Sequence, residues 1–336
     1  MWGVINLVVD LLVLLSSLLL ILTGAKIFTN GIEWLGKSLN LSEGAVGSVL
    51  AAVGTALPET MVPLIAILFA PAGNTHDVGI GAILGAPFML STLALGVVGV
   101  SKLIYCRKGS RCIDVKRSIL IRDLKYFLFF YSLTIAAAFF PSQVPKAPVT
   151  AVLIIGYALY VKKTLGDGDD LANMDLPPLY LWKRNCQAPL YLILVQVAIS
   201  LVLIAAGARF FVNAMNAVAE GLMVPALILS LIVTPFATEL PEKLNSIIWV
   251  KGGKDTLALG NITGAMVFQS TVIPGIGILI TPWELSFVAV LSALLALLSG
   301  LIVYIFALRR SELKPVVMMY PAIIYGIFLL TVITII

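Results

Sequence analysis

Ten apolar stretches, each long enough to cross a lipid bilayer as a helix, occupy most of this 336-residue chain. A bilayer-spanning helix needs about 20 mostly apolar residues. Apolar residues make up 60% of the chain and charged residues 12%, which excludes a soluble globular enzyme, a disordered chain and a nucleic-acid binder. We therefore expect an all-α polytopic membrane protein with about ten transmembrane helices. The stretches lie at about 5–28, 45–69, 79–104, 124–141, 147–162, 190–215, 224–250, 256–281, 284–307 and 316–336.

The basic residues indicate how the chain is oriented in the membrane. The links that follow the odd-numbered stretches hold 18 of the 22 lysines and arginines. By the positive-inside rule we expect these links to be cytoplasmic and both termini to lie outside. The expected location is the cell membrane of a prokaryote. Cys106, Cys112 and Cys186 fall in these links, where they should stay reduced. No basic residue precedes Lys26, so the first stretch is expected to be a membrane helix rather than a cleaved signal.

The two halves of the chain repeat one another. Three blocks recur in the same order: 24–30 at 207–213, 55–59 at 238–242, and 81–86 at 260–265. We expect a first repeat at 1–165, a cytoplasmic loop at 166–185 and a second repeat at 186–336. Five helices per half is an odd number, so the second half enters the membrane from the opposite side, as in many secondary transporters. The loop contains the acidic cluster Asp167–Asp170, either a solvated face or a regulatory ion site.

Glycine pairs in the third and eighth stretches predict close helix packing. Gly81 and Gly85 are four residues apart, and so are Gly260 and Gly264. Small residues at this spacing let two helix backbones approach one another.

Two glutamates at matched positions are the strongest functional signal. Glu59 and Glu242 lie deep within apolar stretches, where a carboxylate is costly unless it faces a cavity or a cation. Each follows a proline, which lacks an N–H and frees the carbonyl four residues earlier. Such oxygen atoms are hard ligands that suit calcium or sodium. The expected cation ligands are Glu59, Glu242, Thr55, Thr238 and the carbonyls of Gly54 and Ala237, with Glu59 and Glu242 as the metal carboxylates. The alternative is that both glutamates are neutral and hydrogen-bonded between helices.

Four further polar residues are candidates for the same site. Glu239 is a third ligand, a proton carrier, or the partner of Lys243 or Arg209. Gln269 interrupts an apolar stretch and is also expected to bind the cation. Ser91 and Ser270 are also candidate ligands, and the alternative for each is a hydrogen bond to the backbone of its own helix, which is common for hydroxyl groups in membrane helices.

At these residues the sequence resembles the cation/calcium exchanger superfamily, which includes the sodium/calcium exchangers and their cation/proton relatives. The family's G-T-S-x-P-E motif stands here at 54–59 and 237–242, and its G-N-x-x-G-S motif at 81–86 and 260–265. The resemblance covers both halves. This chain departs from the family at Ala56 and Glu239, where the motif has serine, and at Leu90 and Gln269, where sodium/calcium exchangers carry Asn or Asp.

The resemblance implies a secondary active cation antiporter that exchanges calcium by alternating access, driven by sodium. The alternative driving ion is the proton. A cation channel or a non-transporting membrane protein is a further alternative, and an enzyme is not expected. The expected partners are inorganic cations and the lipid bilayer, with no cofactor, nucleic acid or nucleotide.

Overall fold

The computed structural model describes residues 2–38, 56–69, 75–105, 113–140, 146–166, 177–182, 188–309 and 313–335. The described residues are almost entirely helical and form no β-strand, which confirms the predicted all-α class. They divide into two compact units. The first unit comprises Met1–Thr75 and Leu159–Met223, and the second comprises His76–Ala158 and Val224–Ile336.

Six helices of the described part are long and apolar enough to cross a membrane. They are Asn6–Leu35, Asp77–Tyr105, Leu190–Leu222, Asp255–Ile280, Phe287–Arg309 and Pro315–Thr334. The stretches predicted at 124–141 and 147–162 correspond to two 20-residue helices, α7 (Arg117–Ala136) and α8 (Ala147–Gly166). The count of ten transmembrane helices stays a prediction.

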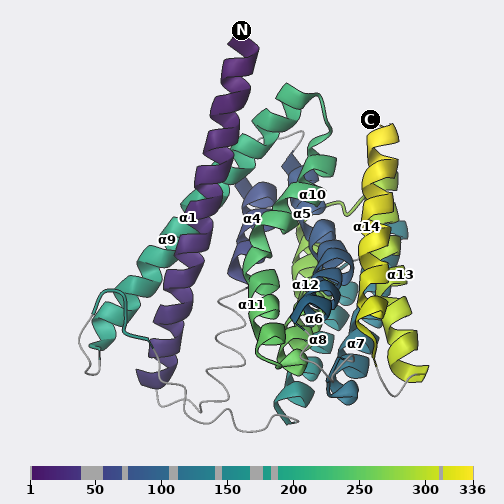
Figure 1. Ribbon diagram of the computed structural model, residues 1–336. Coiled ribbons are helices and arrows are strands. Elements are labelled where there is room, and N and C mark those ends of the chain that lie inside the picture. The colour runs from purple at the N-terminus through teal and green to yellow at the C-terminus, as the bar shows by residue number, and fades with distance from the viewer. Residues whose placement is uncertain are drawn as a thin grey trace. The chain divides into compact units, whose positions relative to one another are not determined.

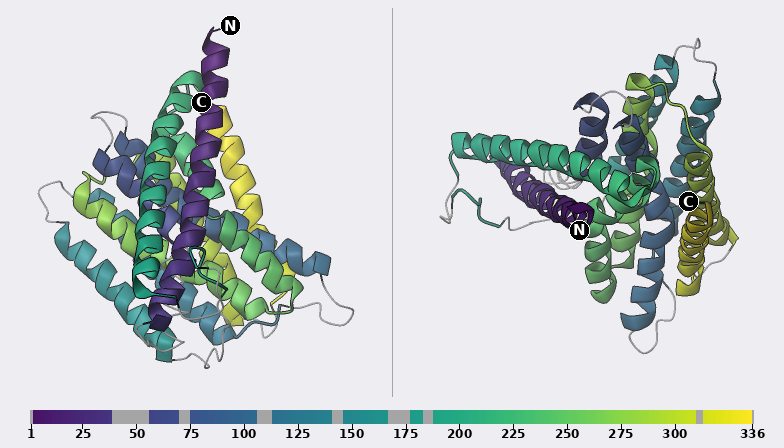
Figure 2. Two further views of the ribbon diagram at one scale, coloured as in Figure 1. Left: turned by 90° about the vertical axis from the view of Figure 1, so that its left-hand side faces the viewer. Right: turned by 90° about the horizontal axis from the view of Figure 1, so that it is seen from above.

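The first unit is built on two long helices, α1 (Trp2–Ser38) and α9 (Leu190–Leu222), which run side by side (Figures 1 and 2). The shorter helix α4 (Leu57–Phe69) packs mainly on α9. A Cβ atom added at Gly24 would lie 2.8 Å from Ile204, and one added at Gly207 would lie 2.9 Å from Ile21. The absence of side chains at these two glycines is therefore what lets the helices touch.

A buried amide network fastens the segment 177–182 to these two helices. The Gln196 side chain on α9 donates to Asn30 Oδ1 on α1 at 3.0 Å, and accepts from the Leu181 N–H at 3.1 Å. Leu179 of the same segment is fully buried. The predicted 166–185 loop is therefore docked on the first unit over part of its length, while 167–176 and 183–185 lie outside the described residues.

The second unit contains the remaining helices, including α8 as far as Ala158. One continuous helical segment consists of α5 (Thr75–Met89), a π-helical turn η2 (Leu90–Ala94) and α6 (Leu95–Tyr105). A 3-10 turn, η3 (Ala137–Phe139), follows α7. The C-terminal part of the unit consists of α10 (Ala226–Thr238), α11 (Leu240–Lys251), α12 (Asp255–Ile280), α13 (Phe287–Arg309) and α14 (Pro315–Ile335).

The glycine pair of α5 packs directly on α10, as the sequence predicted. A Cβ atom at Gly81 would lie 2.5 Å from the Leu227 carbonyl oxygen, and one at Gly85 would overlap the Leu231 carbonyl. The matched position Gly260 differs, because no described atom lies within 4 Å of its Cβ position. The expected close approach is therefore confirmed at Gly81 and Gly85 and is not seen at Gly260.

We expect Gly81→Ala to destabilise the protein by about 1–3 kcal/mol, because the added methyl group meets helix backbone that cannot move aside. The matched control is Gly326→Ala on α14, where no described atom lies within 4 Å of the Cβ position. That change should be neutral or stabilise the helix by up to about 1 kcal/mol. Denaturant titration in mixed micelles measures both variants, and equal stabilities would contradict the packing described for Gly81.

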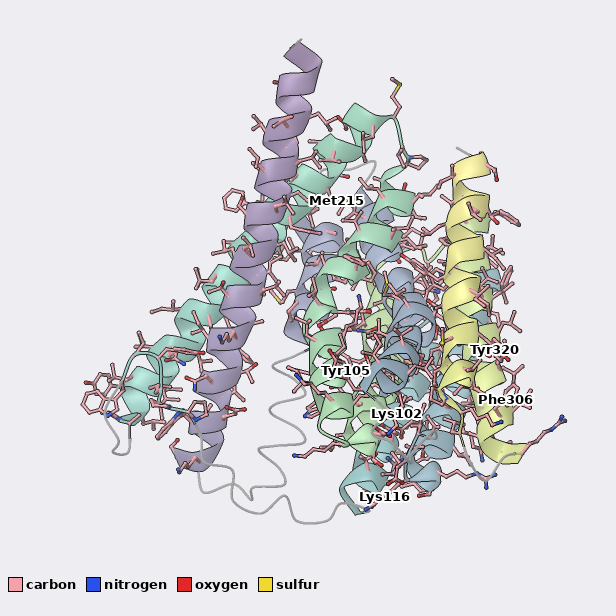
Figure 3. All side chains as sticks on the ribbon, viewed as in Figure 1. Lys102, Tyr105, Lys116, Met215, Phe306 and Tyr320 are labelled. Atoms are coloured by element: carbon pink, nitrogen blue, oxygen red, sulfur yellow. The ribbon has the colours of Figure 1, made fainter. Side chains whose placement is uncertain are left out.

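A charged network holds the α6, α7 and α12 ends of the second unit together. Lys102 on α6, labelled in Figure 3, forms a buried ion pair with Asp255, the first residue of α12. The Asp114 N–H donates to the same Asp255 oxygen at 2.9 Å. The Arg117 guanidinium at the start of α7 donates to the carbonyls of Ala307 and Leu308 on α13. These contacts fix where α12, which carries Gln269 and Ser270, begins.

Candidate cation site

Most of the predicted ligands lie in the second unit, and one carboxylate lies in the first. The first unit contains Glu59. The second unit contains the other described candidates, which are Ser91, Ala237, Thr238, Glu239, Glu242, Gln269 and Ser270. Gly54 and Thr55 lie outside the described residues.

Four of the second-unit candidates, Ala237, Thr238, Glu239 and Glu242, lie at a break between two helices. Helix α10 ends at Thr238 and α11 begins at Leu240, with Glu239 between them at φ −88° and ψ 10°. Pro241 has no N–H to offer the Ala237 carbonyl, so the α-helical hydrogen bonding cannot continue through this point. The break lies where the proline predicted it, in the middle of the 224–250 stretch. Carbonyl groups at the end of α10 and N–H groups at the start of α11 are thereby available to polar side chains.

Glu239 is a fully buried carboxylate at this break. Neither of its two carboxylate oxygens accepts a hydrogen bond of good geometry from the described residues, and the hydrogen-bonding side chain that faces the carboxylate is Gln269. Glu242 is also buried, and its Oε2 atom lacks a described partner. Glu242 lies in the first turn of α11, where the positive end of the helix dipole favours an anion. Two buried carboxylates with free oxygens are costly unless a cation or a proton neutralises them.

The groups that act on Glu239 electrostatically come from two helices. They are Glu242 and Lys243 on α11, which act through their charges, and Gln269 on α12, which acts as a side-chain hydrogen-bond partner. Gln269 is buried, and its Oε1 atom has no hydrogen-bond partner among the described residues. The predicted site residues Glu239, Glu242 and Gln269 therefore lie together, with oxygen atoms that remain available.

Lys243 contacts the end of α10 rather than solvent. Its Nζ atom donates to the carbonyls of Pro235 at 3.4 Å and Phe236 at 3.3 Å, and lies 5.0 Å from the centre of the Phe236 ring. The sequence offered Lys243 as a partner of Glu239, and the structure adds the two backbone carbonyls. The other suggested partner, Arg209, is in the first unit, exposed, with its guanidinium 6.0 Å from the centre of the Phe69 ring.

The predicted hydroxyl ligands use their protons within their own helices. Thr238 donates to the Thr234 carbonyl at 3.0 Å, Ser270 to Val267 at 3.0 Å, and Ser91 to Phe88 at 3.2 Å. Each hydroxyl oxygen keeps lone pairs after donating, and a cation needs only those. Hydrogen bonding within their own helices is the alternative predicted from the sequence for the two serines. It does not prevent their oxygen atoms from binding a cation.

Glu59 occupies the first turn of α4 and is 4% exposed. The carbonyl of Ala56 accepts hydrogen bonds from both the N–H and the hydroxyl of Thr60, at 3.1 and 2.7 Å. The backbone oxygen of the residue that replaces the motif serine thus accepts hydrogen bonds from the first turn of α4. Like Glu242, Glu59 is a buried acid at the positive end of a helix.

Tyr325 is a neighbour of Glu239 that sequence reasoning missed. It is buried on α14, acts electrostatically with Glu239, and its ring centre lies 5.3 Å from that of Phe88. A signal was present, because Tyr325 is a hydroxyl-bearing side chain within an apolar stretch. Among the described residues no three His, Cys, Asp or Glu side chains form a ready metal cage, so a calcium ion here also needs amide, hydroxyl or carbonyl oxygens.

Comparison with known families decides the class of protein. The family model described as sodium/calcium exchanger protein matches residues 9–162 and 192–334, which is most of the chain. The chain belongs to the sodium/calcium exchanger family. This membership confirms the resemblance seen in the two P-E motifs. The exchanger is an integral membrane transporter of cations and not an enzyme.

Curated relatives and solved structures agree with this family. The exchanger is 27% identical over 271 residues to the putative antiporter CaxA of Alkalimonas amylolytica, a match that covers 80% of each chain. It is 24% identical over 274 residues to the inner membrane protein YrbG of Escherichia coli (strain K12), covering 81% of this chain and 80% of YrbG.

Two types of solved exchanger share the fold. The H+/Ca2+ exchanger CAX superimposes with a TM-score of 0.76 at 15% identity, covering 96% of this chain and 82% of CAX. The sodium-calcium exchanger NCX_Mj superimposes with a TM-score of 0.57 at 22% identity, covering 96% of this chain and 98% of NCX_Mj. Since one is a proton exchanger and the other a sodium exchanger, the shared fold leaves the driving ion open.

Proposed function

We propose that this exchanger is a secondary active antiporter that moves calcium in exchange for sodium by alternating access. The observation that carries the proposal is the pair of buried carboxylates, Glu239 and Glu242, at a helix break inside an apolar segment of a sodium/calcium exchanger family member. Buried acids with available oxygens are tolerated when a cation or a proton neutralises them. If calcium and the driving ion use the same carboxylates, each displaces the other, and exchange follows.

The proposed ligands are those of the two matched motifs together with their neighbours. Glu59 and Glu242 would supply the central carboxylates, and Thr55 and Thr238 the hydroxyls. The other proposed ligands are the backbone carbonyls of Gly54 and Ala237 and the side chains of Glu239 and Gln269. The hydroxyl groups of Ser91 and Ser270 are additional candidates. The motif match supports the role of Glu59, and the burial and free oxygens of Glu239, Glu242 and Gln269 support the others.

We further propose that residues 1–165 and 186–336 are inverted repeats joined by the loop 166–185. The family model matches each half separately, which supports this division. A second support is reciprocal packing. Gly24 lies on Ile204 and Gly207 lies on Ile21, and both pairs of positions are related by the offset of 183 residues that aligns the repeats. Two equivalent helices that cross about a two-fold axis exchange contacts in this way.

Calcium/proton exchange is the second candidate, and Glu239 favours it. This carboxylate replaces the serine of the family motif and adds a protonatable group to the ligand set. Ala56 and Leu90 also lack the polar side chains that sodium/calcium exchangers carry at those positions. We expect Glu239→Gln to abolish calcium uptake driven by a pH gradient while the protein stays folded. A Glu239→Gln variant with normal proton-driven uptake would contradict a proton role for this residue.

Calcium-45 uptake into proteoliposomes tests the proposal when sodium and pH gradients are imposed separately. Uptake should occur only with an outward gradient of the driving ion, and should saturate with calcium concentration. Uptake that needs the sodium gradient supports the first candidate, and uptake that needs the pH gradient supports the second. Calcium entry without either gradient, in proportion to concentration, would indicate a channel.

The proposed location is the cell membrane of a prokaryote, with both termini outside. Cys106 and Cys112 lie outside the described residues, and their place in a strongly basic link predicts that they face the cytoplasm. An impermeant thiol reagent added to intact cells should leave them unlabelled and should label them once the cells are opened. Rapid labelling of intact cells would reverse the predicted orientation.

A further inference from the structure

Pro274 interrupts the hydrogen bonding of α12 beside the candidate site. It lies inside this helix and has no N–H to donate to the Ser270 carbonyl, four residues earlier. Ser270 is fully buried and directly follows Gln269, one of the proposed cation ligands. A buried carbonyl group without a donor is costly, and a helix that lacks one of its bonds at a proline bends there. The turn of α12 that carries Gln269 therefore needs a donor from another element.

Thr134 on α7 supplies that donor. Its hydroxyl group donates to the Ser270 carbonyl at 3.0 Å, and the Thr134 side chain is fully buried. Threonine hydroxyls of neighbouring helices are one of the means by which proline is tolerated inside membrane helices. The hydroxyl group of Thr134 thus takes the place of the N–H that Pro274 lacks.

A buried tryptophan holds Thr134 in position. The Trp283 indole N–H donates to the Thr134 carbonyl at 3.1 Å, and Trp283 is fully buried. The backbone N–H of Trp283 donates to the Thr281 hydroxyl at 3.1 Å, and this hydroxyl donates to the Gly277 carbonyl of α12 at 2.8 Å. The last turn of α7 is therefore tied to α12 through the backbone of Thr134 as well as through its side chain.

Gln269 connects the Thr134 hydrogen bond to the candidate site. Its side chain is buried and is a hydrogen-bond partner of Glu239, and its Oε1 atom has no partner among the described residues. Thr134, Gln269 and Glu239 all belong to the second unit. The direction in which the Gln269 side chain leaves α12 depends on the orientation of the turn that Thr134 holds at Ser270.

We propose that Thr134 is a positioning residue for the cation site, because its hydroxyl group holds the interrupted turn of α12 that presents Gln269 to the cation. This inference rests on the proposed function, in which Glu239 and Gln269 bind the transported ion. Thr134 itself does not touch the ion. Loss of its hydroxyl group lowers the affinity for calcium through the orientation of Gln269.

The dependence of calcium-45 uptake on calcium concentration tests this role in proteoliposomes, with whichever of the sodium and pH gradients drives uptake. Thr134→Val removes the hydroxyl group and keeps the size of the side chain. We expect the KM for calcium to rise about threefold to tenfold, as for one lost hydrogen bond, while the maximal rate changes less. Thr134→Ser keeps the hydroxyl group and should have a KM close to that of the wild type. A normal KM in Thr134→Val, or an equal rise in Thr134→Ser, would overturn the proposal.

Two backgrounds test the two steps of the argument. Pro274→Ala restores an N–H that can reach the Ser270 carbonyl within α12, so the Thr134 hydroxyl is no longer needed there. Gln269→Leu removes the side chain that Thr134 is proposed to position. Thr134→Val should therefore raise the KM for calcium much less in either background than in the wild type. An undiminished effect of Thr134→Val in either background would overturn the proposal.

Thr150→Val is the control that separates positioning from helix attachment. The Thr150 hydroxyl on α8 donates to the Gly275 carbonyl of α12 at 3.0 Å, and the Leu279 N–H follows that carbonyl by one helical turn. We expect this variant to lose thermal stability and to keep the wild-type KM. If Thr134 only attached α7 to α12, Thr134→Val would show the same pattern, and that result would overturn the proposal.

Thr134→Ala is the second variant to use if Thr134→Val does not fold. It also removes the hydroxyl group, introduces no larger atom, and should raise the KM for calcium, whereas a normal KM would overturn the proposal. Failure of the proposed function has a different signature, because the wild type would then show no saturable, counter-ion-dependent calcium flux. In that case Pro274→Ala should still recover the melting temperature lost in Thr134→Val.

Discussion

Glu242→Gln should weaken calcium binding at least tenfold, and by a hundredfold or more if the lost charge is not compensated. The substitution keeps the shape of the side chain and removes one negative charge from a buried site. Losing a hydrogen bond to a charged group costs about 1.5–3 kcal/mol, which corresponds to roughly a tenfold to a hundredfold change in affinity. Isothermal calorimetry in detergent and vesicle flux measure the effect. Glu59→Gln should behave in the same way if the matched motifs are equivalent.

The control for this prediction is Glu220→Gln, which neutralises an exposed glutamate in the last turn of α9. It should bind calcium as the wild type does. In the absence of calcium, Glu242→Gln should be at least as stable as the parent protein, because a buried charge has been removed. Near-normal calcium binding and flux in both Glu59→Gln and Glu242→Gln would show that these residues are not ligands, and would favour neutral glutamates that only hydrogen-bond between helices.

Lys102→Met should destabilise the protein by about 3–5 kcal/mol. The substitution leaves Asp255, which is 1% exposed, without its ion-pair partner at the start of α12. Removing one member of a buried pair strands the other charge in a medium that solvates it poorly, and this is the costly case. The Asp114 N–H still donates to Asp255 and offsets only part of the loss. Denaturant titration in mixed micelles measures the change in the free energy of unfolding.

The double variant Lys102→Met/Asp255→Asn distinguishes a stranded charge from lost packing. It removes both charges, so it should recover most of the stability lost in Lys102→Met. Lys125→Met, at an exposed position of α7, should change stability by less than about 0.5 kcal/mol. If the double variant is no more stable than Lys102→Met, the ion pair is not the source of the effect.

Hydropathy predicted the helices well because the bilayer forces backbone groups to pair within each segment. The apolar stretches locate the described helices, and Pro241 predicted the break between α10 and α11. Hydropathy set the end of the first helix near residue 28, whereas α1 continues to Ser38. Residues 29–38 are more polar, but they pack beside α9 and the segment 177–182, where Asn30 and Trp34 form hydrogen bonds. Contacts of that kind are tertiary and cannot be recognised from the hydropathy of the sequence.

The candidate site was predictable where a polar residue interrupts an apolar stretch. Glu239, Glu242 and Gln269 stand out for this reason, and the structure brings them together. Lys102 and Asp255 are 153 residues apart, and nothing in the sequence pairs them. The contact of Lys243 with the Pro235 and Phe236 carbonyls depends on how the chain bends at Glu239, which hydropathy does not describe. Tyr325 was missed because a single tyrosine in a membrane helix is common at the membrane interface as well.

The most direct test of alternating exchange is calcium release from preloaded proteoliposomes into media that differ only in their cations. After releasing calcium outside, an exchanger must bind another ion there before its binding site can face the vesicle interior again. Calcium-45 should therefore stay inside when the outer medium contains only choline chloride. Adding calcium or the driving ion to that medium should release the isotope, and Glu242→Gln should reduce this release severely. Rapid loss of calcium-45 into choline chloride alone, at the same rate at every outside pH, would contradict alternating exchange and show an open pathway instead.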